Sequence, residues 1–215
     1  MSLDIPLDPI TLSYLDTPSE AIRPQSLAFD THLEMCTLTF PQPLKPGRAT
    51  LYLEFMAPIN RGLTGFYLST YKDAKGEEQY IAVTQFEPSS ARRAFPCWDE
   101  PEAKAVFKLT LTVDAKYEVL SNTMEARKEE KEGNRTLHEF EDTPLMSTYL
   151  MAYVVGNLDH IDDYTKKGVL VRVFTRPGNT ETGKLALKTA GNSFIFLFLV
   201  VLYADPFLFL NSQRS

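Results

Sequence analysis

Eight prolines fall within the first 58 residues, and they constrain the fold of this part of the chain more than any other feature. They stand at positions 6, 9, 18, 24, 41, 43, 46 and 58. Proline lacks a backbone N–H, and its ring clashes with the preceding helical turn, so a long helix does not fit between them. Residues 32–40 and 49–56 instead alternate apolar and polar side chains. We expect both to be strands, joined as a hairpin by the turn at 43–47.

The next part of the chain also has the patterns of strands. Residues 65–71 and 79–84 flank the turn-forming sequence 73–76, which predicts a second hairpin. Residues 105–113 alternate cleanly, and 149–155 are continuously apolar. Neither segment carries a central proline, so we expect these two to be among the most buried strands.

Further strands and one helix complete the expected fold. The charged stretch 127–134 is expected to be an exposed hairpin loop, and 169–174 another alternating strand. A helix is predicted over 180–189, with Asn179 or Thr180 as its cap. Roughly ten short strands with turns between them predict an all-β fold. We expect an antiparallel, saddle-shaped β-sandwich with a short C-terminal helix.

Composition indicates which partners and which cellular compartment to expect. The net charge is −6 and the basic residues are scattered, so no basic stripe fits a nucleic acid. Two cysteines, Cys36 and Cys97, do not make a disulfide framework and favour a reducing compartment. The N-terminus shows no basic region followed by an apolar run, so no secretory signal is visible. We expect a cytoplasmic protein.

The C-terminal residues differ from everything before them. Residues 194–204 are apolar without a break, and Asp205 and Pro206 end that run. A membrane-spanning helix needs roughly 20 apolar residues, so membrane insertion is not expected. We predict a β-domain over 1–176, the start of a following helix over 177–190, and an aberrant apolar tail over 191–215.

The chain offers little for hydrolytic catalysis. A catalytic zinc site takes three protein ligands and an open position for water, and helical sites often place two histidines four residues apart. The three histidines stand at 32, 138 and 160. No histidine lies near Cys97 in sequence, and a free cysteine is usually a small buried hydrophobe. We expect no catalytic residue and no metal ligand in this chain.

The segment TQFEPSSARRAFPCWDEP, residues 84–101, is dense in aromatic, charged and proline residues. On its physics alone it reads as a rigid, well-packed loop. We expect Phe95, Trp98 and Phe107 to share one core. The loop also carries charges that can form ion pairs and fix its shape. We expect one of Arg92 and Arg93 to pair with one of Asp99 and Glu100.

This segment closely resembles one in the zinc aminopeptidases of the gluzincin class, which carry HExxH and GAMEN motifs. The resemblance is closest to their puromycin-sensitive branch and spans about residues 25–190. Beyond 84–101, it rests on residues 65–67, 82–87, 104–107, 120–122, 143–150, 154–156, 168–173 and 183–187. The HExxH and GAMEN motifs do not occur in these 215 residues. The resemblance therefore implies the N-terminal domain of such an enzyme, without some upstream strands and truncated before the catalytic domain.

The resemblance also implies a role for two side chains. Glu87 corresponds to the glutamate that binds the free α-amine of the peptide substrate, and Gln85 to a residue lining the pocket for the first side chain. It implies zinc in the full-length family, no cofactor in this chain, and the amino terminus of a peptide as partner. Without the zinc site, this chain alone is expected to be inactive.

Two other readings remain open at the level of sequence. The chain could be a non-catalytic domain that binds peptides or proteins. It could also be attached to a membrane through its apolar tail. The missing HExxH motif distinguishes the truncated aminopeptidase from an enzyme that is active by itself.

Overall fold

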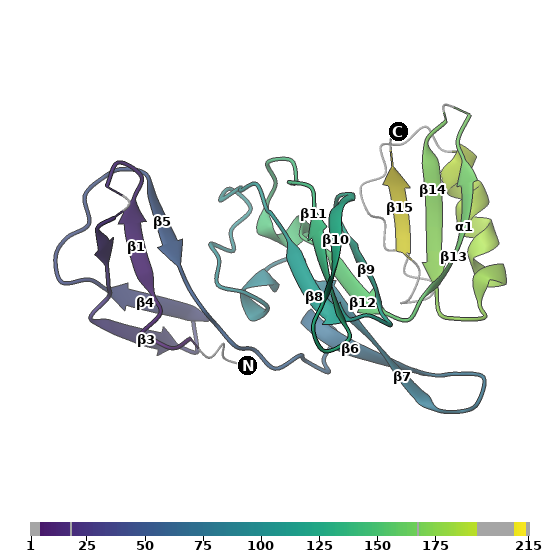
Figure 1. Cartoon of the computed structure of the whole chain (residues 1–215), viewed down its shortest axis with the longest axis horizontal. Helices are drawn as coiled ribbons and strands as arrows, with labels where there is room; N and C mark the ends of the chain where they lie inside the picture. The colour runs from purple at the N-terminus through teal and green to yellow at the C-terminus, as the bar shows by residue number, and fades with distance from the viewer. Residues whose placement is uncertain (1–4, 18, 167, 193–208, 214–215) are drawn as a thin grey trace.

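The chain is built of small antiparallel sheets, with a helix near its C-terminal end (Figure 1). Its computed structural model describes residues 5–17, 19–166, 168–192 and 209–213. Within these residues the strands form five sheets, and all paired strands run antiparallel. The prediction of an all-β antiparallel fold with a short C-terminal helix is confirmed.

The N-terminal strands make two of the sheets. In the first, β1 (Thr11–Tyr14) lies between β2 (Ala21–Ile22) and β5 (Ala49–Tyr52). In the second, β3 (Ser26–Asp30) pairs with β4 (Met35–Thr39). Both sheets lie at one end of the molecule, away from the larger central sheet (Figure 1).

The hairpin expected between residues 32–40 and 49–56 is therefore wrong. Both segments contain strands, but β4 pairs with β3, and β5 pairs with β1. In the first pair Leu38 lies opposite Leu27, so the apolar residues of the two strands share a face. Neither β1 nor β3 was expected as a strand, so their partners β5 and β4 were expected to pair with each other.

The central sheet has the order β6-β7-β12-β9. Its strands are β6 (Gly65–Lys72), β7 (Glu78–Gln85), β12 (Tyr153–Gly156) and β9 (Glu118–Ser121). The predicted hairpin is confirmed, because β6 and β7 pair along their whole length. The Asp73 carboxylate accepts hydrogen bonds in the turn between them, from the backbone amides of Lys75 and Glu77.

Each face of this sheet carries a cluster of buried side chains. Tyr153 and Val154 are neighbours on β12, so they point to opposite faces, and they belong to different clusters. One cluster of buried side chains consists of Tyr67, Tyr71, Ile81, Val83, Leu120, Val154 and Phe174. A second cluster, here called the loop cluster, consists of Phe86, Ala91, Met146, Met151 and Tyr153. Residues 151–154 are buried as expected, but the strand expected over 149–155 begins only at Tyr153. The segment before it is a 3-10 turn (Thr148–Leu150), in which Leu150 is 46% exposed.

A third sheet corrects two expectations. It consists of β8 (Thr110–Asp114), β11 (Arg135–Phe140) and β10 (Glu125–Lys131), with β11 in the middle. Most of the charged stretch 127–134 is therefore an exposed edge strand, and the turn is confined to its last residues. Charged residues suit such a position, because they discourage pairing with another chain.

The expectation of a well-formed, deeply buried strand over 105–113 is also wrong. The strand begins only at Thr110, and residues 105–113 are exposed or half-buried. Before it, Ala105 forms an isolated bridge with Met146. The amide of Phe107 then donates to the Thr143 side chain, so no continuous strand ladder forms there.

The C-terminal sheet consists of β13 (Asp159–Tyr164), β14 (Leu170–Thr175) and β15 (Phe209–Gln213). The helix α1 (Thr180–Asn192) lies against β13 and β14, with Ala186 in a core shared with β14. The strand predicted at 169–174 and the helix predicted at 180–189 are confirmed.

The apolar tail falls mostly on residues 193–208, which lie outside the described residues. The backbone of β15, at the end of that tail, pairs with β14. Among the described residues, no helix is both long and apolar enough to cross a membrane. The division of the chain at 176 and 190 stays a prediction.

Candidate functional site

Glu87 lies just beyond the end of β7, on a turn between two buried residues. Phe86 before it is 2% exposed, and Ala91 after it is fully buried. Glu87 itself is exposed, and within the described residues its carboxylate has no hydrogen-bond or ion-pair partner. The peptide bond between Glu87 and Pro88 is cis. The structure thus presents a free carboxylate just beyond the end of an inner strand of the central sheet.

Gln85 is the last residue of β7 and is half-buried. Its side-chain amide lies 3.4 Å from the backbone carbonyl oxygen of Glu87, a long hydrogen bond. The two residues to which the resemblance assigns substrate binding therefore lie close together, Gln85 at the end of β7 and Glu87 on the turn that follows. The roles themselves remain predictions.

Hydrogen bonds within the chain segment close the turn that carries Glu87. The amide of Ser90 donates to the carbonyl oxygen of Phe86 at 2.7 Å. A short 3-10 turn (Ala91–Arg93) follows, and the amides of Ala94 and Phe95 both donate to the Ala91 carbonyl. Glu87 is therefore held between a buried strand end and a bonded turn.

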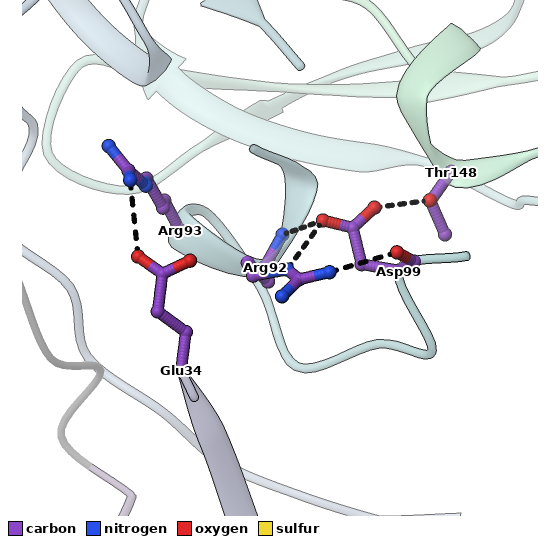
Figure 2. Close-up of polar contacts among 5 residues, drawn as sticks. All are labelled: Glu34, Arg92, Arg93, Asp99 and Thr148. Carbon is purple, nitrogen blue, oxygen red and sulfur yellow. Dashed lines mark hydrogen bonds and ion pairs between the residues drawn. The ribbon is translucent and has the colours of Figure 1, made fainter. Parts of the chain in front are cut away.

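Asp99 fastens this turn to the rest of the domain (Figure 2). One carboxylate oxygen accepts from both the backbone amide and the Nε of Arg92, at 3.1 and 3.0 Å. The other accepts from the Thr148 hydroxyl at 2.6 Å. Arg92 also donates through Nη2 to the Asp99 carbonyl oxygen at 3.0 Å. The Asp99 side chain is 2% exposed, so this is a buried carboxylate with its oxygens bonded.

The expected ion pair between the basic pair and the acidic pair is confirmed as Arg92 with Asp99. Sequence reasoning missed Thr148, which reaches Asp99 from 49 residues further along the chain. Nothing in the local sequence of Thr148 indicates this partner. Such a bond depends on tertiary packing, which a sequence pattern does not reveal.

Arg93 points the other way, to the N-terminal strands (Figure 2). Its guanidinium lies 3.1 Å from the Glu34 carboxylate, and it donates to the Thr64 hydroxyl at 3.3 Å. Glu34 sits in the turn between β3 and β4 with a positive φ of 53°. Gly65 lies under the arginine with φ 74°, and a Cβ there would come within 3.1 Å of the Arg93 Cβ.

Aromatic rings form the floor beneath the turn. Phe86 meets Phe95 and Tyr153 edge to face, and Phe95 meets Phe107 in the same way. The expected contact of Phe95 with Phe107 is therefore confirmed. The expectation for Trp98 is wrong, because this side chain is 75% exposed. Its neighbour Asp99 faces inward, so the alternation of the backbone turns Trp98 outward.

Cys97 is half-buried beside the loop cluster. Burial, and then the nearby Asp99 carboxylate, raise the pKa of its thiol to about 12. The thiolate is the nucleophilic form of cysteine, so this thiol is poorly suited to nucleophilic catalysis at neutral pH. The interpretation of Cys97 as a packing residue agrees with this environment.

The histidines do not converge. His138 is 2% exposed and its Nδ1 lies 2.5 Å from the Glu125 carboxylate, while His32 and His160 are exposed elsewhere in the fold. Across the described part of the chain, no group of three or more His, Cys, Asp or Glu side chains could hold a metal ion. The turn therefore offers recognition of a cation by Glu87, and the described residues add no metal centre to it.

Comparison with known proteins gives the same family as the resemblance. Residues 10–150 match the Peptidase M1 N-terminal domain. Aminopeptidase M1 of Arabidopsis thaliana is 43% identical over 169 residues, which are 79% of this chain and 19% of that protein. Puromycin-sensitive aminopeptidase of Caenorhabditis elegans is 38% identical over 178 residues, 82% of this chain and 19% of that protein.

A third relative, aminopeptidase M1-B of Oryza sativa subsp. japonica, is 46% identical over 160 residues, 74% of this chain and 18% of that protein. The chain thus spans about a fifth of the length of these relatives. The family match begins at residue 10, just before β1, and includes Gln85, Asp99 and the turn that carries Glu87. The chain belongs to the M1 aminopeptidase family, in which it corresponds to the N-terminal domain.

Proposed function

We propose that this chain is the N-terminal part of a zinc-dependent aminopeptidase, and that Glu87 holds the α-ammonium group of a peptide substrate. One observation carries the proposal: Glu87 is an exposed carboxylate without a partner among the described residues, fixed on a turn between buried Phe86 and Ala91. The family match, which covers this turn, supports it.

The chemistry of a peptide's amino terminus suits this carboxylate. A hydrogen bond between charged groups contributes about 1.5–3 kcal/mol. A carboxylate that binds the α-ammonium at a fixed distance from the reacting centre places the first peptide bond of the substrate there. This arrangement favours removal of single residues from the amino terminus. Gln85, at the end of β7 beside Glu87, lines the pocket for the first side chain in this proposal.

The zinc of such an enzyme has no ligand set among the described residues of this chain. Ground-state recognition of the substrate by Glu87 does not stabilise a transition state, so it does not by itself accelerate hydrolysis. We therefore assign to this chain the recognition of the substrate and not its cleavage. Its peptide partners are cytoplasmic in this proposal, which the two free cysteines support.

A binding experiment tests the role of Glu87. The ligand is L-leucinamide, which carries a free α-ammonium, and the control ligand is N-acetyl-L-leucinamide, which does not. Both are titrated into the isotope-labelled full chain and followed by NMR chemical shifts. Leucinamide is expected to shift resonances around 85–91, and the acetylated compound is not.

Two glutamate variants sharpen this test. Glu87→Gln is expected to abolish leucinamide binding, because it removes the charge and keeps the shape. Glu78→Gln, at the exposed start of β7, is the matched control and is expected to bind normally. Equal binding of both ligands, or normal binding by Glu87→Gln, would refute the proposal.

The isolated chain is also expected to be catalytically inert. Purified protein should contain far less than one zinc per molecule and should not cleave aminoacyl fluorogenic substrates. Stoichiometric zinc together with chelator-sensitive turnover would show a metal site that we have not assigned.

A second candidate, binding of another protein without catalysis, is favoured by exposed apolar side chains close to the turn. Trp98 is 75% exposed and Leu145 is 66% exposed, although each adjoins a residue that packs in or against the loop cluster. Exposed apolar surface of this kind often marks a protein interface. In this case Trp98→Ala would weaken binding of the partner, whereas Glu87→Gln would not.

A further inference from the structure

We propose that Asp99 is a positioning residue, which fixes the direction of the Glu87 carboxylate through Arg92. This inference rests on the proposed function of Glu87. It adds a buried carboxylate that does not touch the substrate but determines where the substrate's ammonium group is held.

Asp99 holds the main chain of the 3-10 turn that follows Glu87. Its Oδ2 accepts the backbone amide of Arg92, which belongs to the 3-10 turn that follows Glu87. This bond acts on the main chain, so it holds the turn itself and not only a side chain. Arg92 adds two side-chain bonds to Asp99, through Nε and Nη2.

The other oxygen of the Asp99 carboxylate connects to a distant segment of the chain. Thr148 belongs to a second 3-10 turn (Thr148–Leu150), and its hydroxyl donates to Asp99 Oδ1 at 2.6 Å. The neighbouring Ser147 hydroxyl donates to the carbonyl oxygen of Pro101 at 2.5 Å. Met151, one residue beyond this second turn, is a member of the loop cluster. Asp99 therefore links the turn that carries Glu87 to a segment anchored in the core.

The other ion pair between this turn and a distant part of the chain is much more exposed than Asp99. Arg93 pairs with Glu34, and their side chains are 43% and 39% exposed. Glu87 itself and its neighbours Pro88 and Ser89 are exposed. The bond from the Ser90 amide to the Phe86 carbonyl closes the turn locally, but it does not connect the turn to another part of the chain. A binding group gains affinity when the surrounding structure holds it in the bound geometry. Among the described residues, Asp99 supplies a charged, buried contact of this kind.

The test uses the full chain and two readouts. Amide hydrogen exchange over residues 87–94 reports the order of the turn, and titration with L-leucinamide reports its binding. Asp99→Asn removes the charge and keeps the shape. Thr148→Val removes only the hydroxyl bond to Asp99, and Thr148→Ser restores it. Glu100→Gln, an exposed neighbouring carboxylate, is the matched control.

Asp99→Asn is expected to speed exchange in the turn by about tenfold or more and to weaken leucinamide binding by about tenfold. Thr148→Val is expected to show the same changes to a smaller degree, and Thr148→Ser to restore both values. Exchange in β13 and β14 should remain unchanged in all variants. If Asp99 only stabilised the fold, the variants would also change exchange outside the turn, and Thr148→Ser would restore exchange there as well.

The outcomes separate this inference from the proposal on which it rests. If the wild-type chain does not bind leucinamide, the proposed function fails, and the inference fails with it. If the wild-type chain binds leucinamide and both Asp99→Asn and Thr148→Val bind it equally well, only the inference is overturned. If Asp99→Asn does not fold, Thr148→Val with its Thr148→Ser rescue decides the question alone.

Discussion

The N-terminal strands and the central sheet share the same kind of alternating sequence but differ in burial. In β3 and β4 most side chains are exposed, and Phe29 is 46% exposed. In β7 four consecutive residues are buried, and Ile81 is 3% exposed. The difference is that the central sheet carries a hydrophobic cluster on each face, whereas β3 and β4 belong to none of the three core clusters of the described residues.

Alternation therefore predicts a strand but not its contribution to stability. A side chain contributes by the apolar area that it removes from water, about 25 cal/mol per Å². An exposed phenylalanine on β3 removes little, and a buried one at the end of β7 removes much. Substitutions in the N-terminal strands should therefore lower stability less than substitutions in the central sheet and its loop cluster.

The largest effect is expected from truncating a phenylalanine in each region. Phe86→Ala should lower the free energy of unfolding by about 3–5 kcal/mol, because Phe86 is 2% exposed and lies in the loop cluster. Phe29→Ala should lower it by less than about 1 kcal/mol. Urea denaturation followed by circular dichroism measures both. Equal losses would show that the N-terminal strands have a core as well packed as that of the central sheet.

A smaller effect is expected from two glycines of the β6–β7 hairpin. Both have a positive φ, 74° at Gly65 and 80° at Gly76. Alanine in such a conformation costs about 1–2 kcal/mol at either position. Gly65→Ala should cost about 1 kcal/mol more, since its Cβ would meet the Arg93 Cβ at 3.1 Å, whereas Gly76 has open space. Thermal denaturation of the two variants measures the difference; identical melting temperatures would contradict it.

The two thiols should differ in their rate of reaction. Cys36 is exposed on β4, whereas Cys97 is half-buried and its pKa is raised to about 12 from 9.0. A raised pKa lowers the thiolate fraction at pH 8, so Cys97 should react with a disulfide reagent at least about tenfold more slowly. Its rate should keep rising as the pH approaches 12. In Cys36→Ser only the slow phase should remain, and a fast phase there would contradict the burial of Cys97.

The smallest effect is expected at Trp98, although it lies beside the loop cluster. Trp98→Ala should change the free energy of unfolding by less than about 0.5 kcal/mol, because the side chain is 75% exposed. Trp98 is the single tryptophan of the chain. Acrylamide should therefore quench its fluorescence almost equally in native and urea-unfolded protein. Much weaker quenching by acrylamide in the native protein would show that Trp98 is buried in the core.

Much of the fold could be predicted where the signal is local. The β6–β7 hairpin was predicted from its turn-forming residues, and the Asp73 carboxylate accepts a hydrogen bond from the Lys75 amide in that turn. The helix α1 was predicted from a capping residue at Asn179 or Thr180. The partner of β4 could not be predicted in this way. Strand pairing depends on which apolar faces meet. Leu38 lies opposite Leu27, and this pairing could not be predicted because Leu27 was not expected to lie in a strand.

The candidate site was predictable to a similar extent. Short separation and opposite charge were sufficient to predict the pairing of Arg92 with Asp99. They were not sufficient for Thr148 or Glu34, because these contacts bring together segments that are distant in sequence. The outward direction of Trp98 could not be read from its apolar character either, since the buried carboxylate next to it sets the orientation of the backbone.

The two adjacent arginines should differ in their tolerance to substitution over evolution. Arg92 uses its planar guanidinium in two directed bonds to Asp99, so lysine at this position would keep the charge and lose the geometry. Arg93 makes a partly exposed ion pair with Glu34, which a lysine ammonium could replace. In a collection of homologous sequences, basic residues should therefore interchange at position 93 and remain arginine at position 92.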